Sequence, residues 1–273
     1  MDKEKKKRKI PVLLIVFLFF VIWSLWSFVP VTERISLDLT GDEPGVRIVL
    51  ITDLHSCYYG SEQRSLIKRI DKEEPDIIIL GGDIFDDRQD EENSKILVEY
   101  LAEKYPCYYV TGNHEYWSGE ADDIKEYLRG IGVEVLCGDC KSIELNGRLL
   151  DICGVDDPTS IGKEWNRQLE QASAQTDDSH IKILVSHRPE RVSDYEKYDY
   201  DLILCGHAHA GQIRVPFFNR GLFAPDQGFM AYYVSGGYEL SNGSTMIVSR
   251  GLARESTPCP RFFNHPEIVT IDL

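Results

Sequence analysis

The chain has 273 residues, of which 42% are hydrophobic and 27% are charged, and its formal net charge is −15 at pH 7. This composition is ordinary for a globular protein and excludes a collagen-like, low-complexity or disordered chain. The acidic balance argues against a nucleic-acid-binding protein, because such proteins present a basic surface. We therefore expect no nucleic-acid partner.

The N-terminal segment differs from the rest of the chain. Residues 1–9 carry six basic and two acidic side chains, and residues 10–29 form an uncharged, mostly apolar run with aromatic residues near its end. About 20 apolar residues in a helix span the ~30 Å hydrocarbon layer of a bilayer. The alternative is a cleaved signal peptide, but the apolar region of a signal peptide is shorter than this run. We expect an uncleaved transmembrane helix.

The same segment predicts the location and the domain organisation. Basic flanks remain in the cytoplasm, so the folded part is expected on the extracytoplasmic side of the cell membrane. The predicted division is a cytoplasmic basic tail, a transmembrane anchor, a juxtamembrane segment and one catalytic domain, at 1–9, 10–29, 30–45 and 46–273. Seven cysteines leave at least one thiol unpaired in an exported chain. Cys137 and Cys140 form a lone C-x-x-C, which argues against a zinc site there.

After residue 46, short apolar runs alternate with helical patterns, taken here in chain order. Buried strands are expected at 47–52, 76–80, 108–111, 181–186 and 201–205, because these runs are apolar and end in turn residues. Apolar residues three or four apart predict amphipathic helices at 65–70, 94–105, 121–128 and 162–175. The chain beyond residue 222 is rich in strands and turns, with strands expected at 230–233, 245–249 and 268–271. These elements predict a layered α/β domain with parallel strands early and antiparallel strands late.

Side chains that can bind metals follow each of the five buried strands. The segments are D-L-H at 53–55, G-G-D-I-F-D at 81–86, G-N-H-E at 112–115, a single histidine at 187 and G-H-A-H at 206–209. Ligands of α/β sheets bind beyond the carboxyl ends of the strands. One aspartate alone is often a helix cap, and one histidine alone is more often structural. Five such segments in equivalent positions indicate a shared site.

The residue types in these segments indicate a metal centre. Aspartate, asparagine and histidine supply mixed oxygen and nitrogen donors, which suit Mn, Fe, Zn or similar ions better than Ca alone. There are more donors than one ion needs, which favours two ions about 3.5–4 Å apart that share a bridging carboxylate. Residues two apart in an extended segment point the same way, as the D-x-H and H-x-H spacings require.

Taken in order, D-x-H, G-D-x-x-D, G-N-H-[DE], a single histidine and G-H-x-H resemble the motifs of the calcineurin-like metallophosphoesterase superfamily. The segments at 211–216, 248–252, 261–264 and 266–268 are similar to a bacterial membrane-associated branch, the UDP-diacylglucosamine hydrolase-like phosphoesterases. The resemblance covers residue 46 to the end of the chain. It implies an αββα fold, in which a layered β-sandwich core is flanked by helices, and two divalent metal ions as cofactors.

The resemblance also implies roles for individual residues. The first metal ion would be held by Asp53, His55, Asp83 and His209. Asp83 would bridge to a second ion, which would be held by Asn113, His187 and His207. His114 would stand next to the leaving group, with Asp86 as the partner that orients it.

The expected function is that of a membrane-anchored, metal-dependent phosphohydrolase. It would cleave a phosphomonoester, phosphodiester or pyrophosphate by in-line attack of a metal-bridging hydroxide, with His114 protonating the leaving oxygen. The expected partners are a phosphorylated small molecule or lipid-linked substrate and, through the N-terminal helix, the membrane. One alternative is a metal-stabilised surface binding or sensor module without turnover, which would not require His114 and Asp86. Another is a nuclease of the same superfamily, which the missing basic surface disfavours.

Four aromatic residues flank the first and third motifs: Tyr58, Tyr59, Tyr116 and Trp117. They are either the walls of a substrate groove or part of the core.

Overall fold

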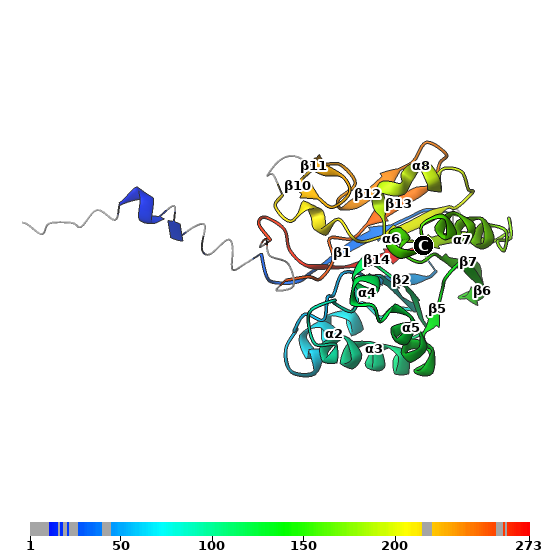
Figure 1. Ribbon diagram of the computed structural model, residues 1–273, viewed down its shortest axis with the longest axis horizontal. Helices are drawn as coiled ribbons and strands as arrows, with labels where there is room; N and C mark the ends of the chain where they lie inside the picture. Colours follow the sequence, from blue (N-terminus) through cyan, green and yellow to red (C-terminus); the bar gives the residue numbers. More distant parts are fainter. Residues whose placement is uncertain are drawn as a thin grey trace, which may run out of the picture.

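The computed structural model describes residues 11–15, 17–18, 21, 27–39, 45–214, 220–254, 259 and 261–273 (Figure 1). The basic tail at 1–9 lies outside the described residues, and so do residues 10, 16, 19–20 and 22–26 of the expected anchor. Within the described part of the chain, no helix has both the length and the apolar character needed to cross a bilayer.

Two six-stranded sheets form the centre of the described structure. The first has the order β1 (Val31–Ser36), β14 (Glu267–Asp272), β2 (Arg47–Ile51), β3 (Ile77–Gly81), β4 (Cys107–Val110) and β5 (Glu134–Val135). The second has the order β12 (Gly236–Glu239), β13 (Thr245–Val248), β9 (Leu202–Cys205), β8 (Ile181–Val185), β7 (Arg148–Gly154) and β6 (Asp139–Leu145). A separate hairpin consists of β10 (Gly221–Ala224) and β11 (Gly228–Ala231).

The alternation of side chains along each strand builds three hydrophobic layers. On β2, Ile48 and Leu50 belong to the layer that also holds Ile152 and Ile183 of the second sheet. Val49 and Ile51 point the opposite way, into a layer shared with the helices that cover the first sheet. A third layer packs the outer face of the second sheet, and Trp165 is buried in it.

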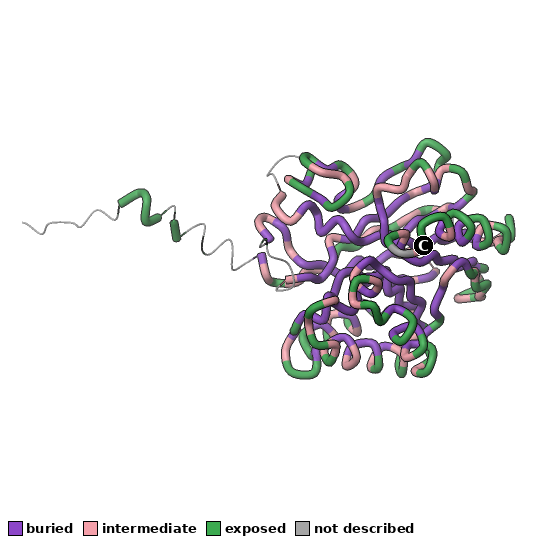
Figure 2. The backbone as a smooth tube through the Cα atoms, in the orientation of Figure 1, coloured by how far each residue is buried: buried purple, intermediate pink, exposed green. Residues whose placement is uncertain are grey.

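Helices cover the outer faces of the sandwich. The first sheet is covered by α2 (Arg64–Asp71), α3 (Glu92–Lys104) and α5 (Ala121–Gly130), and the second by α7 (Lys163–Ser173) and α8 (Val192–Tyr195). The shorter helices are η1 (Ser61–Gln63), α4 (Asn113–Ser118), α6 (Pro158–Ile161), η2 (Pro189–Arg191) and η3 (His209–Gly211). Buried backbone runs through the middle of the molecule and exposed backbone follows the outer helices (Figure 2). The predicted mixed α/β fold, with sheets flanked by helices, is confirmed.

Five strands were predicted to precede the candidate metal-binding segments, and four helices were predicted between them. All of these elements occur close to their expected bounds, but other expectations need correction. β1 lies in the range expected to be a juxtamembrane segment, and it pairs in parallel with β14 from Val31↔Glu267 to Ser36↔Asp272. The late strands are not simply antiparallel, because β13 pairs in parallel with β9. The hairpin β6–β7 was not predicted, since its exposed edge strand shows little apolar alternation. Cys140 and Cys153 are register partners in this hairpin and form a disulfide.

The strand arrangement explains why the motifs meet. β2, β3 and β4 are parallel neighbours in the first sheet, and β8 and β9 are parallel neighbours in the second. Parallel strands end at the same edge of a sheet, so the loops after all five strands lie at one edge of the sandwich. Tertiary structure thereby brings together residues that are far apart in the chain, such as Asp53 and His207, which are separated by 154 positions.

Candidate metal centre

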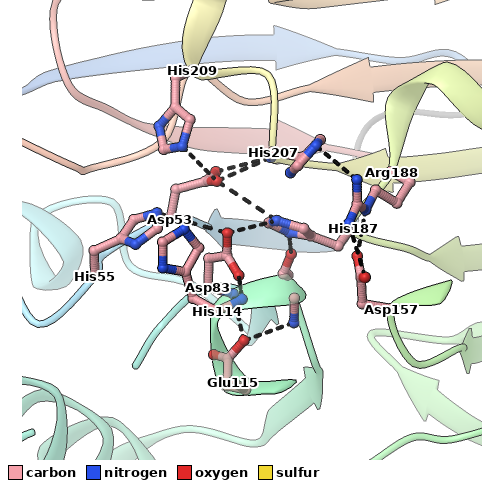
Figure 3. Close-up of polar contacts among 12 residues, drawn as sticks. Asp53, His55, Asp83, His114, Glu115, Asp157, His187, Arg188, His207 and His209 are labelled. Carbon is pink, nitrogen blue, oxygen red and sulfur yellow. Dashed lines mark hydrogen bonds and ion pairs between the residues drawn. The ribbon is translucent and has the colours of Figure 1, made fainter. Parts of the chain in front are cut away.

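The five loops place all of the predicted ligands in one buried cluster. Three groups of side chains each have potential ligand atoms within 4.8 Å of one another: Asp53, His55 and His209; His55, Asp86 and His114; and Asp83, His187 and His207. The close-up shows the carboxylates of Asp53 and Asp83 facing the histidine rings between the two sheets (Figure 3). Asn113, at the start of α4, is also buried, and it lines the same cavity as Asp83.

The orientation of His187 leaves a metal-binding nitrogen facing a carboxylate. Its Nδ1 donates a hydrogen bond to the carbonyl oxygen of Gly81 at 2.8 Å. That bond leaves the lone pair of Nε2 available, and Nε2 lies 3.0 Å from Oδ2 of Asp83. Two lone pairs at this distance repel each other unless a proton or a cation lies between them. Burial lowers the pKa of His187, but the charges of Asp83 and Asp53 outweigh burial and raise the pKa to about 10.

A carboxylate orients the ring of His55, as a backbone carbonyl orients the ring of His187. Its Nδ1 lies 2.9 Å from Oδ2 of Asp86, and its Nε2 lies 3.7 Å from Oδ2 of Asp83. A carboxylate that hydrogen-bonds one ring nitrogen fixes the tautomer and strengthens the other nitrogen as a ligand. Both rings therefore present Nε2 to Asp83.

The unsatisfied atoms of the site fit metal ligation. Four buried atoms here have no hydrogen-bond partner among the described residues: His55 Nε2, Asp83 Oδ2, Asn113 Oδ1 and His187 Nε2. His209 presents its Nε2 to the cluster, 3.6 Å from Oδ1 of Asp53. Buried polar atoms are normally paired, so a cluster of orphans calls for an explanation. Their mixed oxygen and nitrogen chemistry matches the donor set of Mn, Fe or Zn. Burial lowers the pKa of His209 to about 3, which keeps this ring neutral and able to bind a metal.

Several site residues hold strained backbone conformations. Asp53, His55, Asp83, His207 and His209 have φ angles of 51°, 48°, 51°, 64° and 45°. A residue with a side chain pays about 1–2 kcal/mol in this left-handed region, and such residues cluster at functional sites. Gly82, with a φ of 91°, is also required sterically, because a Cβ there would lie 2.6 Å from Nδ1 of His187.

His114 lies beside the cluster, but its closest partner differs from the expected one. Its Nδ1 is 2.7 Å from Oδ1 of Asp87 and 3.4 Å from Oδ2 of Asp86. Oδ2 of Asp86 also lies 2.9 Å from Nδ1 of His55, so Asp86 contacts both histidines and Asp87 is a second partner of His114. Burial lowers the pKa of His114, but its interactions with Asp86 and the charges of Asp83 and Asp87 raise the pKa to about 9.

Glu115 is a structural residue of the site to which sequence reasoning assigned no role. Its buried carboxylate accepts hydrogen bonds from the backbone N–H groups of Gly112, Asp83, Ile84 and Phe85 at 2.8–3.1 Å. It therefore ties the loop after β3 to the loop after β4. Its position three residues after Gly112, at the start of a helix, was the available signal.

A second network, centred on Arg188, was also missed. Its guanidinium donates to Oδ2 and Oδ1 of Asp157 at 2.5 and 3.0 Å and to Oγ1 of Thr159 at 2.6 Å. It also pairs with Asp226, and its Nη1 lies 2.9 Å from Nε2 of His207. Because Nε2 of His207 is engaged by this network, Nδ1 is the nitrogen that remains for a metal. Arg188 follows His187 directly, but no spacing rule identifies its distant partners.

The C-terminal segment supports the loop that carries His209. Nδ2 of Asn264 donates to the carbonyl oxygens of His209 and Gln212 at 2.7 and 3.1 Å. Arg261 is fully buried and donates to the carbonyl oxygens of Ala253 and Gly251 at 2.5 and 3.1 Å. These contacts give a structural role to the R-F-F-N segment at 261–264.

A cavity of about 400 Å³ opens above the cluster. Its walls include His114, Trp117, Asp87, Arg88, Phe223 and Asp226. The rings of His114 and Trp117 have centroids 4.7 Å apart. Trp117 thus walls the predicted groove, whereas Tyr59 is buried in the core and its hydroxyl donates to the carbonyl oxygen of Leu252.

Comparison with known proteins agrees with this geometry. Residues 46–211 match the family model described as calcineurin-like phosphoesterase. The match covers more than half of the chain, and the chain belongs to this family of hydrolases. A solved structure titled as a dimetal phosphatase from Danio rerio has the same fold, with a TM-score of 0.52, 14% identity and coverage of 84% of this chain and 99% of that one.

Three sequence relatives are similar to the chain. An "uncharacterized metallophosphoesterase" of Helicobacter pylori is 29% identical over 233 residues, which make up 84% of this chain and 60% of the relative's length. Phosphodiesterase YaeI of Escherichia coli is 30% identical over 158 residues, 56% of each chain. A Bos taurus protein is 26% identical over 246 residues, 84% of this chain and 53% of its own, and is named as a transmembrane protein with a metallophosphoesterase domain.

Proposed function

We propose that this chain is a metal-dependent phosphohydrolase that cleaves a phosphomonoester, phosphodiester or pyrophosphate bond in the cavity above the buried cluster. The observation that carries the proposal is the group of four buried oxygen and nitrogen atoms, on His55, Asp83, Asn113 and His187, that lie in the cluster without hydrogen-bond partners. His114 stands beside them and lines the cavity, where a substrate would bind.

The ligands divide into two sets. Asp53, His55 and His209 would hold one ion, and Asn113, His187 and His207 the other. Asp83 would serve both, since its Oδ2 faces His55 and His187. Two divalent ions bound there, such as Mn, Fe or Zn, would lower the pKa of a coordinated water and neutralise the phosphoryl oxygens.

The neighbouring residues would complete the reaction. His114, held through Nδ1 by Asp87, would donate a proton to the leaving oxygen, a role in which a positioned acid contributes about 10²–10⁴-fold in rate. Asp86 would orient His55 as a ligand. Glu115 would hold the loops that carry Asp83 and Asn113 at a constant separation, which preorganises the site.

Hydrolysis of bis-p-nitrophenyl phosphate by the full chain in mild detergent, stripped of metal and then reloaded with Mn, tests the proposal. We expect metal-dependent turnover that falls at least about 100-fold in His114→Ala and in Asp83→Asn. His180→Ala is the matched control, because that histidine pairs with Asp151 and belongs to none of the ligand groups. Metal binding without hydrolysis of any monoester, diester or pyrophosphate would contradict the proposal and favour a binding or sensor module.

We further propose that residues 10–29 anchor the enzyme in the membrane, with residues 1–9 in the cytoplasm and the catalytic domain outside. The uncharged apolar run and its basic flank support this placement. An anchored enzyme favours substrates in or near the envelope, such as a lipid-linked phosphoester of the kind that a UDP-diacylglucosamine hydrolase-like enzyme would cleave. Retention of the chain in the membrane fraction after alkaline carbonate extraction would support the anchor, and release would contradict it.

A further inference from the structure

A cluster of basic side chains lines a shallow pocket next to the start of β1. The pocket has a volume of about 570 Å³, and its walls include Lys68, Arg69 and Lys72 along α2 together with Pro30 and Val31. None of the three basic side chains forms an ion pair with a described residue, whereas the neighbouring Arg34 is paired with Glu73 at 2.7 Å. In a chain with a net charge of −15, uncompensated positive charge at one place indicates a local binding role.

A second exposed surface lies on the hairpin β10–β11. Phe223 and Phe229 are register partners on its two strands, with ring centroids 5.9 Å apart. Their exposed fractions are 52% and 77%, and the adjacent Met230 is 40% exposed. An exposed group of large apolar side chains marks an interaction surface.

Short links connect these two surfaces to the place where the chain enters the domain. The carbonyl oxygen of Val29 accepts a hydrogen bond from Nδ1 of His265 at 3.1 Å. Phe262, three residues before His265, forms a β-bridge with Ile213. Arg214, the residue after Ile213, forms a β-bridge with Gly221 at the start of the hairpin. In Figure 1, α2 lies below β1 and β10–β11 lie above it, all toward the left side of the domain.

We propose that Lys68, Arg69, Lys72, Phe223 and Phe229 form a membrane-contact face that binds a bilayer containing anionic phospholipids. This inference rests on the proposed anchor. Basic residues near a bilayer are attracted to anionic headgroups, and aromatic side chains favour the interface between headgroups and acyl chains. Phe223 also lines the catalytic cavity, so docking would bring that cavity to the level of the lipid headgroups.

Tryptophan quenching in vesicles tests the membrane-contact face separately from the anchor. The full chain is reconstituted with phosphatidylglycerol and a lipid brominated in its acyl chains, which quenches nearby tryptophan fluorescence. Quenching in a chain carrying Trp117→Phe, which keeps Trp23, Trp26 and the buried Trp165, reports insertion of the anchor. In a chain carrying Trp23→Phe, Trp26→Phe and Trp117→Phe, which keeps only the buried Trp165 as background, Phe229→Trp reports contact of the hairpin with the bilayer. Leu149→Trp in the same background is the control, because Leu149 is an exposed apolar residue of β7.

We expect quenching at position 229 and none above background at position 149. Lys68→Glu combined with Lys72→Glu should lower the ratio of docked to undocked protein at least about 25-fold, because each of the two basic residues contributes about fivefold near an anionic surface. The matched control is Lys141→Glu with Lys163→Glu, two exposed lysines of β6 and α7, which should leave the ratio unchanged.

The proposal is wrong if position 229 is not quenched, or if the two pairs of charge reversals act alike. Absence of quenching at Trp23 and Trp26 contradicts the anchor instead, and position 229 still decides whether the face binds the vesicle surface. High salt should weaken docking without releasing an inserted chain, since screening acts on exposed charges.

Discussion

Replacement of Glu115 by glutamine should destabilise the site more than its small change in shape suggests. Oε1 of Glu115 accepts from the N–H groups of Ile84 and Phe85, and Oε2 accepts from those of Gly112 and Asp83. The side-chain amide of glutamine keeps one of these oxygens, but its NH₂ group replaces the other. Two backbone N–H donors would then face a donor instead of an acceptor. Each buried donor left unsatisfied costs about 1–3 kcal/mol, so we expect Glu115→Gln to lose roughly 2–6 kcal/mol. That loss is a large share of the 5–15 kcal/mol typical of a folded domain.

Urea unfolding of the full chain in a non-ionic detergent, followed by circular dichroism, measures this loss. The loss should appear both with chelator and with Mn, because the hydrogen bonds of Glu115 do not depend on an ion. Metal affinity should fall as well, since Asp83 and Asn113 lie on the two loops that Glu115 joins. Glu126→Gln, on the exposed face of α5, is the matched control and should change stability by less than about 0.5 kcal/mol. A loss below about 1 kcal/mol for Glu115→Gln would refute the reasoning.

Three further predictions concern the metal ions, the two neighbouring aspartates and acid stability. Removal of metal with a chelator should lower the free energy of unfolding by about 2.7 kcal/mol for each bound ion, relative to metal at 100 times its dissociation constant, and an unchanged melting temperature would contradict the site. Asp86→Asn should weaken metal binding about 10–100-fold through His55, whereas Asp87→Asn should slow turnover through His114 with little change in metal affinity by calorimetry. The carboxylate of Asp71 is partly buried, which raises its pKa, but bonds to Lys104, Tyr100 and Tyr105 outweigh burial and lower it. Its contribution is present above the unfolded pKa of about 3.9 and is lost as the pH falls through the lower folded value, so Asp71→Asn should cost about 1–2 kcal/mol at pH 7 and progressively less in acid.

Local sequence was sufficient to predict the parts of this protein that local chemistry controls. The run R-I-V-L-I-T predicts a buried strand because its residues are β-branched or apolar, and β2 follows it within one residue. The residues after each such strand, among them Asp53, His187 and His207, are recognisable because metal ligation needs a small set of side chains. The rule that parallel strands end at one edge then predicts that they meet.

Only the tertiary structure decided which neighbour each of these side chains contacts. Asp86 and Asp87 are adjacent in the chain and chemically identical, so the path of the loop after β3 decides that Asp86 contacts both His55 and His114 while Asp87 contacts His114. Arg188 meets Asp157 and Asp226, which are 31 and 38 residues away. Such contacts come from packing between elements, and no period or spacing in the sequence encodes them.

The edges of the fold also contain features that the sequence did not predict. The range of β1 was assigned to a juxtamembrane segment because it follows the expected anchor. The strand is half exposed, yet it pairs with β14 through backbone hydrogen bonds that any sequence can make. The proposed membrane-contact face likewise combines α2 with β10–β11, which are more than 140 residues apart in the chain. Sequence alone therefore determined the strands and the chemistry at their ends, whereas the partners of the ligands and the surfaces around them were decided by contacts between distant segments.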